Sequence, residues 1–494
     1  MQKIYISVLL LCLFFLCGII LNFFPLNEIS KESLIREKNN GLLFHLQETS
    51  KNPVDIYVDN AIVIKNGRDL YPITAQIIHP IEIKVGQKKQ TIHIDSLQKD
   101  TVIPIYLKYK DRMISYRLHT LPKKFPQIMV KKNSDVPNGY ILISFHGLKL
   151  KDPSYSIITD SSGQIVYYRG NEKPLYSMFH LQQWRLKNGK IRYSMHIQEE
   201  DSQSLISSFV SGYHLVLNEN FEVIDKVRLL PTPEHPELLA DEHEFILLDD
   251  GHYVVLGYKP IRITLSNNKT SLGFAGIVQE QKDGRVVFEW SGENNQKLID
   301  GCYERCPVLM PSQADFMHVN SIHIDPNDNH FVISLGSSYS LIKLHRKTGQ
   351  VLWYLGGKND EFGLTEQQKF LRQHDAQILS SGELILFDNA TTGMWKKEYD
   401  YFNKQPIVNP ARIIVMNLDE ENKKLLSFRE IPLNFYAKFM GSVQKLSSDK
   451  WFVGCGSSTE CAAKLIDAKG NDLLIMSVKQ PYTMYRAYWV DSLN

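Results

Sequence analysis

The chain has 494 residues, with 56 Lys and Arg against 54 Asp and Glu, so its formal net charge is only +2. A charge this close to zero gives no electrostatic reason to expect a nucleic-acid partner. Hydrophobic residues make up 43% of the chain, an ordinary fraction that argues against wholesale disorder and against many membrane spans. The length suffices for two or three domains, or for one large repeat domain with an appendage.

An uncharged, apolar stretch lies between Lys3 and Glu28. About 20 apolar residues can cross a bilayer as a helix, whereas a cleavable signal has a shorter apolar core and a small-x-small cleavage site. We therefore expect residues 1–27 to be a membrane anchor or signal segment, with an uncleaved anchor favoured. The body of the protein would then be exported and would be periplasmic or otherwise extracytoplasmic. A cytosolic protein with a buried N-terminal helix is the alternative.

Four cysteines lie outside the apolar stretch, in two close pairs: Cys302 with Cys306, and Cys455 with Cys461. Neither pair has the Cys-x-x-Cys spacing of a zinc or redox site. Small loops closed by disulfide bonds are typical of oxidising compartments. We therefore predict one disulfide bond within each pair, with four unrelated thiols as the alternative.

Short β-runs separated by turn residues follow from Pro53 to about Leu121. Such spacing is typical of a small antiparallel sandwich, so we assign residues 28–126 to an N-terminal β-sandwich domain. It contains no clustered acids or histidines at ligand spacing, which favours a structural or partner-contacting role. A proline-bounded linker, residues 121–126, ends it.

Two hairpin repeats run through residues 127–494. The first is a pair of apolar strands joined by a turn rich in Asp, Asn and Gly, which supply the backbone freedom of a tight hairpin. Its six copies begin at Ser156, His214, Ile277, Leu341, Ile413 and Lys464. The second repeat lies between copies of the first and mostly begins with histidine. Its copies begin at His180, His243, His318, His374 and, in degenerate form, Gly441, with Gly139–Phe145 as the equivalent in the first unit.

Two hairpins per period make a four-stranded sheet, and six periods make six sheets. Such sheets cannot bury both faces alone, so we predict that they stack around an axis as a six-bladed β-propeller. The strand Thr483–Val490 is expected to complete the first blade and close the ring. The predicted fold class is all-β: a six-bladed propeller, preceded by a small β-sandwich and an N-terminal hydrophobic helix. A two-sheet sandwich or an open β-solenoid is the alternative.

In a propeller, the start of each innermost strand faces one end of the central channel. His180, His243, His318 and His374 are therefore expected to occupy equivalent positions and to form a partial ring there. Asn320 points to the same side of its strand as His318, because side chains alternate with period two. Such a ring is compatible with structural hydrogen bonds, with metal binding, or with a nucleophilic histidine whose neighbours stabilise anionic charge.

Several segments are similar to the bacterial arylsulfotransferase family, whose members transfer sulfate between phenols without a nucleotide sulfate donor. They read DEHEFILLDDGHYVVLGY, FMHVNSIHIDPNDNHFVIS, KLHRKTGQVLWYLGG, QHDAQILSSGELILFDN and GCGSSTE with MYRAYWV. Each is weak alone, but together and in this order they are specific, and the likeness extends from about Leu121 to Leu493. The family's fold, a six-bladed propeller with an N-terminal β-sandwich, agrees with the repeat count.

The resemblance implies roles for particular residues. His374 matches the family's nucleophile, which becomes a sulfohistidine, and His243 and His318 match histidines that line the sulfate and phenol site. Asn320 matches a sulfate-binding asparagine. A neutral imidazole is a good nucleophile near pH 7, and N–H donors and cations stabilise the charge that spreads over sulfuryl oxygens. We expect an aryl sulfate and a phenol as partners, with no cofactor and no metal.

One position departs from the family. Its sulfate-binding arginine would align with Gly336, and the loss of a guanidinium from an anion site is not a conservative change. Arg372 and Arg486 are the candidates to replace it. Two hypotheses therefore remain: an exported sulfotransferase with a two-step histidine mechanism, and a membrane-anchored, non-catalytic propeller that binds a ligand or an envelope partner. A homodimer is compatible with either.

Overall fold

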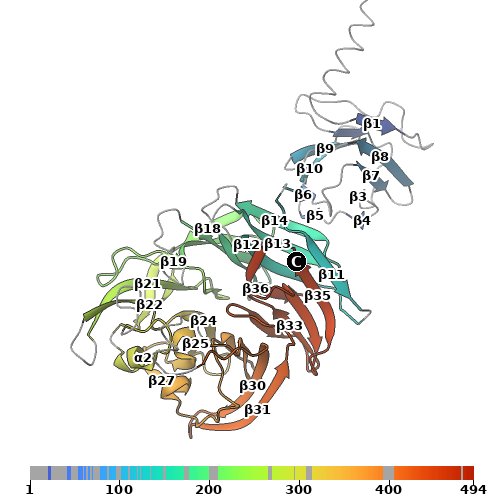
Figure 1. Ribbon diagram of the computed structural model, residues 1–494. Helices are drawn as coiled ribbons and strands as arrows, with labels where there is room; N and C mark the ends of the chain where they lie inside the picture. Colours follow the sequence, from blue (N-terminus) through green and yellow to red (C-terminus); the bar gives the residue numbers. More distant parts are fainter. Residues whose placement is uncertain are drawn as a thin grey trace, which may run out of the picture. The chain divides into compact units, whose positions relative to one another are not determined.

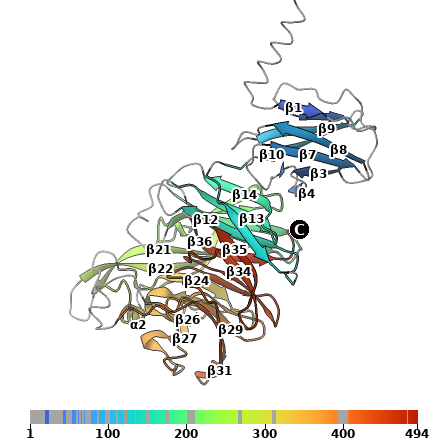
Figure 2. The ribbon, with the colours of Figure 1, turned by 45° about the vertical axis from the view of Figure 1, so that its right-hand side comes forward.

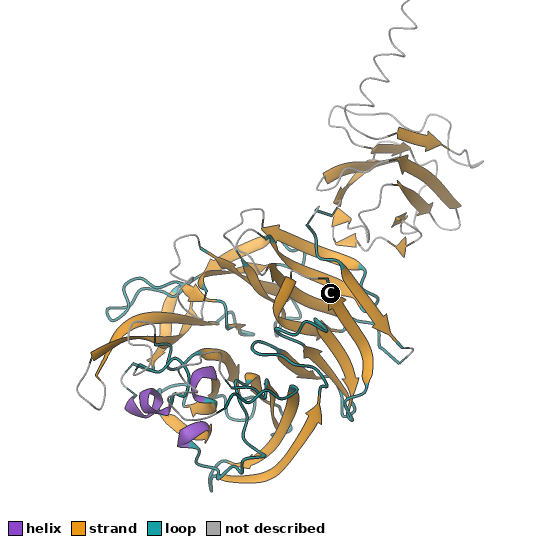
Figure 3. Ribbon diagram, viewed as in Figure 1, coloured by secondary structure: helices purple, strands orange, loops and turns teal. Residues whose placement is uncertain are grey.

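The computed structural model describes residues 121–493 except for 123, 134, 148–151, 172–176, 200–209, 265–269, 294, 308–313, 393–404 and 480–481, together with the backbone strands before residue 121. The chain divides into two compact units, Met1–Phe125 with Ile158–Tyr168, and Pro126–Ile157 with Arg169–Asn494. Among the described residues, strands dominate and helices are few (Figure 3). The predicted all-β class is therefore confirmed.

The N-terminal unit contains two five-stranded sheets (Figure 2). The first has the order β1 (Ile20–Phe23), β8 (Lys88–Asp95), β7 (Ile78–Val85), β3 (Val54–Val58), β4 (Ala61–Ile62). The second has the order β2 (Leu42–His45), β9 (Val102–Tyr109), β10 (Arg112–His119), β6 (Asp69–Leu70), β5 (Lys65–Asn66). The sheets are mixed rather than purely antiparallel, because β2 pairs with β9, and β10 with β6, in parallel.

The end of the apolar N-terminal stretch is a strand, not the helix that its composition predicts. Residues Ile20–Phe23 form β1, which pairs antiparallel with β8. Residues 1–19, where the rest of the predicted anchor or signal falls, lie outside the described residues. Among the described residues, no helix is long and apolar enough to cross a bilayer.

Six sheets follow one another around a channel, and they confirm the predicted six-bladed propeller (Figure 1). From channel to rim, the first three are β36 (Tyr482–Val490), β12 (Tyr140–Gly147), β13 (Ser154–Asp160), β14 (Ile165–Asn171); β15 (Met178–Arg185), β16 (Ile191–Gln198), β17 (Ser211–Leu217, with β19, Ala240–Asp241, at its side), β18 (Val223–Val227); and β20 (Phe245–Leu247), β21 (Tyr253–Thr264), β22 (Thr270–Lys282), β23 (Arg285–Ser291).

The other three blades repeat the pattern. They are β24 (Val319–Ile324), β25 (Phe331–Leu335), β26 (Ser340–Leu344), β27 (Val351–Gly356); β28 (His374–Ile378), β29 (Leu384–Asp388), β30 (Arg412–Asp419), β31 (Lys424–Pro432); and β32 (Ser442–Lys445), β33 (Lys450–Gly454), β34 (Ala463–Asp467), β35 (Asp472–Val478), with β11 (Ile128–Lys132) outermost. The described parts of the connections contain the short helices α2 (Gln296–Gly301), η2 (Gly336–Ser338) and η3 (Gly357–Asn359).

The ring is closed twice. As the sequence predicts, β36 returns from the far end of the chain to pair with β12 of the first blade. In addition β11, whose closing role the repeats do not reveal, pairs antiparallel with β35 as the fifth strand of the last blade. Each end of the propeller chain thus completes a sheet made mostly by the other end.

The two ends of the channel differ in their connections. At one end, inner strands turn into their neighbours through tight hairpins, where Gly251 and Gly382 adopt φ of +84°, a conformation that suits glycine. At the other end, where β20, β24 and β28 begin, the connections are long; residues 292–318 and 389–411 are two of them. Long loops on a rigid scaffold are where binding and catalytic residues concentrate, so this end is the candidate site.

Candidate active site

Three histidines from successive blades meet at the loop-rich end of the channel. His374 opens β28, His318 stands directly before β24, and His243 stands two residues before β20. The rings of His243 and His318 meet edge to face, with their centroids 4.9 Å apart. His318 is close enough to His374 to lower the pKa of its imidazole. We call these three residues the histidine cluster.

Hydrogen bonds fix the tautomer of His374. Its Nδ1 lies 2.8 Å from the carbonyl oxygen of Arg372 and 2.8 Å from Oδ1 of Asn389. The amide of Asn389 cannot be reversed without loss, because its Nδ2 donates to the carbonyl oxygens of Ala437 and Met440. Both neighbours of Nδ1 are therefore acceptors, and Nδ1 carries the proton. The unprotonated Nε2 accepts a 3.2 Å hydrogen bond from the backbone N–H of Met440.

The other two histidines have carboxylate partners instead. Nδ1 of His243 lies 2.7 Å from Oδ1 of Asp241, and Nδ1 of His318 lies 2.8 Å from Oδ2 of Asp315. A carboxylate at Nδ1 orients the ring and stabilises its protonated form. In each ring, Nε2 is therefore the nitrogen that can give a proton to a substrate or take one from it.

Burial keeps His374 neutral. Desolvation, followed by the nearby His318, holds its pKa well below the usual value, although the hydrogen bond to Asn389 acts in the opposite direction. The pKa of His318 is also lowered, chiefly by burial, while Asp315 counteracts this effect. Asp315 therefore lets His318 take up a proton more easily than burial alone would allow, whereas the described hydrogen-bond partners of His374 are uncharged groups.

One group in the described part of the chain has the spacing of metal ligands: Asp241, Glu242 and His243, whose ligand atoms lie within 4.8 Å of one another. Asp241 is engaged with His243, and Glu242 accepts a hydrogen bond from the backbone N–H of Val210. Burial, together with Asp241, raises the pKa of Glu242. These contacts explain the close spacing of the three residues without a metal ion: Asp241 orients His243, and Glu242 binds the backbone of Val210.

Asn320 follows His318 by two residues and is fully buried. Its Nδ2 donates one hydrogen bond, 2.8 Å long, to the carbonyl oxygen of Gln373, which leaves the second N–H of the amide for another acceptor. A Cβ at Gly336 would lie 2.9 Å from this Nδ2 and 2.7 Å from Cδ2 of His318. No larger residue fits at Gly336 unless His318 moves, so the family's arginine has no equivalent on this turn.

The two arginines proposed to replace it have different surroundings. Arg372 lies close enough to lower the pKa of both His374 and His318, and its side chain, 13% exposed, pairs with Glu304 at 3.4 Å. Arg486 is 2% exposed and bonds to Glu244 at 2.9 Å and to the carbonyl oxygen of Asn320 at 2.6 Å. The placement favours Arg372 as the substrate-facing cation.

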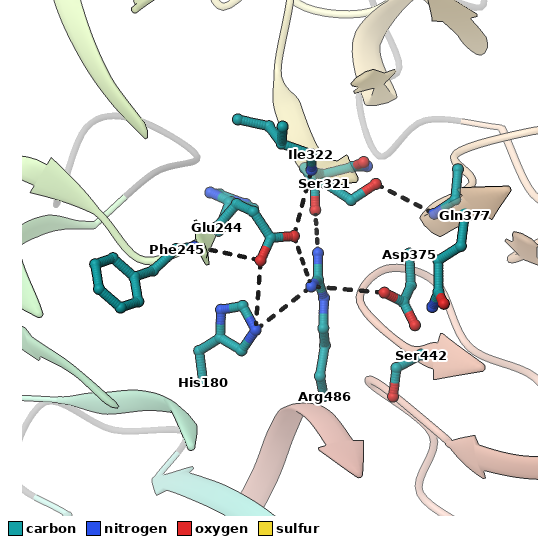
Figure 4. Close-up of polar contacts among 12 residues, drawn as sticks. His180, Glu244, Phe245, Ser321, Ile322, Asp375, Gln377, Ser442 and Arg486 are labelled. Carbon is teal, nitrogen blue, oxygen red and sulfur yellow. Dashed lines mark hydrogen bonds and ion pairs between the residues drawn. The ribbon is translucent and has the colours of Figure 1, made fainter. Parts of the chain in front are cut away.

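Arg486 belongs to a second group, which we call the buried charge network: His180, Glu244, Asp375 and Arg486 (Figure 4). Its guanidinium lies between the two carboxylates, with Asp375 at 3.6 Å. Nε2 of His180 bonds to the hydroxyl of Tyr488 at 2.8 Å and lies 3.7 Å from Glu244. Every charged member has a charged partner, which is the arrangement that buried ions require.

The predicted equivalence of the four histidines is wrong in detail. Bulges displace the register of three inner strands, and the last residue paired before each bulge is Phe179, Val319 or His374. Relative to His374, His318 therefore stands one residue earlier and His180 one residue later. This offset turns His180 into the buried charge network and away from the histidine cluster.

A cavity of about 1160 Å³ lies on the other side of the buried charge network, toward the tight-turn end. Its wall includes Glu244 and Arg486 of the network, and Lys187, Asp250 and Lys347 from the turns. The described lining of this cavity includes members of the network but none of the histidine cluster.

The predicted disulfide bonds remain predictions. Cys455 and Cys461 lie side by side as thiols, and the pKa of Cys455 is raised first by burial and then by its hydrogen bond with Cys461. Cys302 and Cys306 are both buried in the loop that follows α2. That loop also contains Glu304, the partner of Arg372.

Several residues of the site escape the sequence analysis. Asn389 lies within the quoted segment ending in Phe-Asp-Asn, but nothing in the sequence assigns it to Nδ1 of His374. Asp241 and Asp315 precede their histidines by two and three residues, a spacing that could have indicated the pairs. Met440 and Glu304 have no sequence signal, because their contacts come from other blades and loops.

The family model for arylsulfotransferases (ASST) matches residues 204–479, more than half of the chain. The chain therefore belongs to the arylsulfotransferase family. The matched region includes the whole histidine cluster and Asn389, whereas Tyr485 and Arg486 lie beyond it.

No curated protein sequence matches the chain. Among solved structures, it is similar to the dihydro-heme d1 dehydrogenase NirN (12% identity, TM-score 0.31, 71% of this chain and 56% of that one). It is also similar to a luciferin-regenerating enzyme (10%, 0.33, 72% and 97%) and to an auxiliary nutrient binding protein from Bacteroides ovatus (6%, 0.28, 88% and 87%). Nothing about the chemistry of this chain follows from similarities this weak.

Proposed function

We propose that this protein transfers a sulfuryl group from an aryl sulfate to a phenolic acceptor through a sulfohistidine at His374. The observation that supports the proposal best is the fixed tautomer of His374, with its proton on Nδ1 and its lone pair on Nε2. A neutral imidazole with a defined lone pair is what a nitrogen nucleophile requires. The low pKa of His374 keeps it in this form near neutral pH.

In the first half-reaction, Nε2 of His374 attacks the sulfur of the donor. The N–S bond forms while the S–O bond to the aryl group breaks, and the leaving phenolate takes a proton from Nε2 of His243 or His318. The ring of the sulfohistidine then has a positive charge and retains its Nδ1 proton. The Arg372 carbonyl oxygen and Asn389 Oδ1, both 2.8 Å from Nδ1, stabilise that charge.

In the second half-reaction, the deprotonated histidine takes the proton of the phenolic acceptor. The acceptor oxygen attacks the sulfur, the N–S bond breaks, and the electron pair returns to Nε2 of His374. The Asp241 and Asp315 carboxylates support the acid and base roles, because each stabilises the protonated form of its histidine. The resting hydrogen bond from Met440 to Nε2, at 3.2 Å, is lost when Nε2 attacks.

The test is intact-mass analysis of the purified protein after a brief exposure to a chromogenic aryl sulfate without acceptor. A sulfuryl adduct in the wild type and none in His374→Ala is the expected result, with release of the chromophore that depends on added phenol. An adduct that persists in His374→Ala would place the nucleophile elsewhere.

The alternative function is a non-catalytic propeller that binds a ligand or an envelope partner. The observation that favours it is Gly336, where the family has its sulfate-binding arginine and where no side chain fits beside His318. Absence of acceptor-dependent release across several aryl sulfate donors would favour this alternative over catalysis.

We infer that the propeller works outside the cytoplasm. The support is the apolar stretch between Lys3 and Glu28 and the two close cysteine pairs. Protease added to intact spheroplasts is expected to degrade the protein. Full protection would contradict the assignment.

A further inference from the structure

The turn that lacks the family's arginine has a different role in this chain. It comprises η2, Gly336–Ser338, and ends at Tyr339, whose φ is +51°. The carbonyl oxygen of Ser337 accepts hydrogen bonds from the backbone N–H groups of Tyr303 and Glu304, at 2.8 and 3.0 Å. The turn therefore holds the loop between Cys302 and Cys306 in a fixed position.

The side chain of Glu304 is fixed as well. It is 6% exposed, accepts a hydrogen bond from the hydroxyl of Tyr339, and lies 3.4 Å from the guanidinium of Arg372. A buried carboxylate requires a cation or donors, and Glu304 has both. Tyr303 stacks on Tyr339 with ring centroids 5.1 Å apart, which adds to the stiffness of this contact.

Arg372 reaches this position from the loop before β28. Its backbone has φ of +53°, an uncommon conformation for a residue with a side chain. In this conformation Arg372 makes two contacts at once. Its carbonyl oxygen accepts a hydrogen bond from Nδ1 of His374, and its guanidinium pairs with Glu304. An arginine side chain in water has many rotamers, and a carboxylate partner removes that freedom before a substrate arrives.

We propose that Glu304 is a positioning residue that holds Arg372 beside the histidine cluster as the sulfuryl-binding cation, in place of the side chain missing at Gly336. The proposal rests on the proposed function, because it concerns the same site. It makes the Cys302–Cys306 loop part of the anion-binding machinery, although Glu304 itself touches no substrate.

The kinetic test is a double-mutant cycle in kcat/KM for an aryl sulfate. Arg372→Gln is expected to lose about 100-fold, the effect of one stabilising group at a developing anion. Glu304→Gln keeps an acceptor for Tyr339 and is expected to lose about tenfold, a typical effect of a supporting partner. The double variant is expected to be no worse than Arg372→Gln. Losses that multiply, or an unchanged Glu304→Gln, would overturn the proposal.

A matched control is Glu366→Gln. This carboxylate lies on the same loop as Arg372, is 82% exposed and pairs with Lys369. It is expected to retain wild-type kcat/KM. A tenfold loss in this control would show that any charge removed from this face has the same effect, and would also overturn the proposal.

A second readout needs no turnover. Inorganic sulfate is titrated into each variant, and the imidazole signals of His318 and His374 are followed by NMR. Arg372→Gln removes a nearby positive charge, so it is expected to raise the pKa of both imidazoles and to weaken sulfate binding. Glu304→Gln removes the negative charge that pairs with Arg372, so it is expected to lower the pKa of both imidazoles and to weaken sulfate binding less. Shifts in the same direction would contradict the proposal. If the wild type binds sulfate in this way but transfers none, the proposed function fails while the positioning role stands.

Discussion

The histidine cluster and the buried charge network both come from the inner strands and the residues directly before them, yet they have different chemistry. Their members are often adjacent in sequence: His243 precedes Glu244, and His374 precedes Asp375. Successive side chains point to different sides of the strand. In the cluster, a neighbouring oxygen fixes Nδ1 of each imidazole, and Nε2 is the nitrogen left to react. In the network, the charged groups are paired with groups of opposite charge.

Whether a buried histidine is reactive or structural therefore depends on its hydrogen-bond and charge partners, not on its being a histidine. His180 and His374 are both buried histidines with a strongly lowered pKa. Asn389 and the backbone carbonyl of Arg372 orient His374 through Nδ1, and among the described residues Nε2 accepts a hydrogen bond from the N–H of Met440. His180 contacts Tyr488, Glu244 and Arg486. Glu244 and Arg486 in turn form an ion pair with each other.

The largest expected effect is the loss of activity in His374→Ala. Removal of the group that forms the covalent intermediate is expected to reduce kcat by about 10⁴-fold or more, because no neighbour can replace it. The measurement is acceptor-dependent release from an aryl sulfate. His180→Gln is the matched comparison from the network and should retain most of the turnover of the folded protein. Equal losses in both variants would erase the distinction between the two groups.

The network should show its effect in stability instead. Arg486→Met leaves Glu244 and Asp375 buried without their cation, and loss of one partner from a buried ion pair costs about 3–5 kcal/mol of the free energy of unfolding. Urea denaturation followed by tryptophan fluorescence measures this. Folded Arg486→Met is expected to form the sulfuryl adduct at His374. A variant of normal stability that cannot form the adduct would place Arg486 in the reaction.

His243→Ala and His318→Ala are expected to leave residual activity. Each removes an acid or base that acts only in the transition state, which is worth about 2–4 kcal/mol, or roughly 30- to 1000-fold in kcat/KM. Asn320→Ala should behave in the same way with a milder loss. The adduct should still form in all three with a donor whose phenolate leaves easily. Absence of the adduct in His318→Ala would make that histidine a candidate nucleophile.

The smallest expected effect concerns pH and stability. Burial lowers the pKa of His146 and His196 to about 4, whereas the unfolded chain takes up a proton near 6.5. The unfolded state therefore binds more protons below pH 6.5, and stability is lost as the pH falls from there to about 4. Each histidine contributes about 2 kcal/mol of loss at pH 5. Glu242 and Glu244, whose pKa burial raises, oppose this trend.

The contribution of one histidine is isolated by a comparison of wild type and His196→Gln. The variant should lose less of its free energy of unfolding between pH 7 and pH 5, measured by urea denaturation at each pH. An identical loss in the two proteins would show that His196 does not titrate in this way.

The repeats predict the propeller because each hairpin has its own local signal: period-two strands, a turn rich in Asp, Asn and Gly, and a histidine at a regular place. The meeting of His243, His318 and His374 follows from that architecture. Their partners do not, since Asn389, Glu304 and Met440 reach the site from other strands and loops. The placement of His180 depends on a bulge between Phe179 and Gln182, and a one-residue shift of register is invisible in the sequence pattern.

The N-terminal strand β1 shows a further limit. Apolar composition alone makes residues 20–23 part of a membrane-spanning helix, whereas they pair with β8. A short apolar run is compatible with a helix and with a strand. Here the run pairs with β8, a strand some 70 residues further along the chain, and that distant pairing makes it a strand.

The closing strand β36 has a consequence for how the molecule is made. It contributes Tyr485, whose hydroxyl bonds to the backbone of His243 and Asn320, and Arg486 at the centre of the network. Ribosomes synthesise this strand after all five of the other inner strands. Until it emerges, Glu244 and Asp375 have no cation and the first blade has no inner strand. The ring of inner strands is therefore complete only after β36 has been made, and a chain halted before β36 would have every histidine of the cluster but an unclosed first blade.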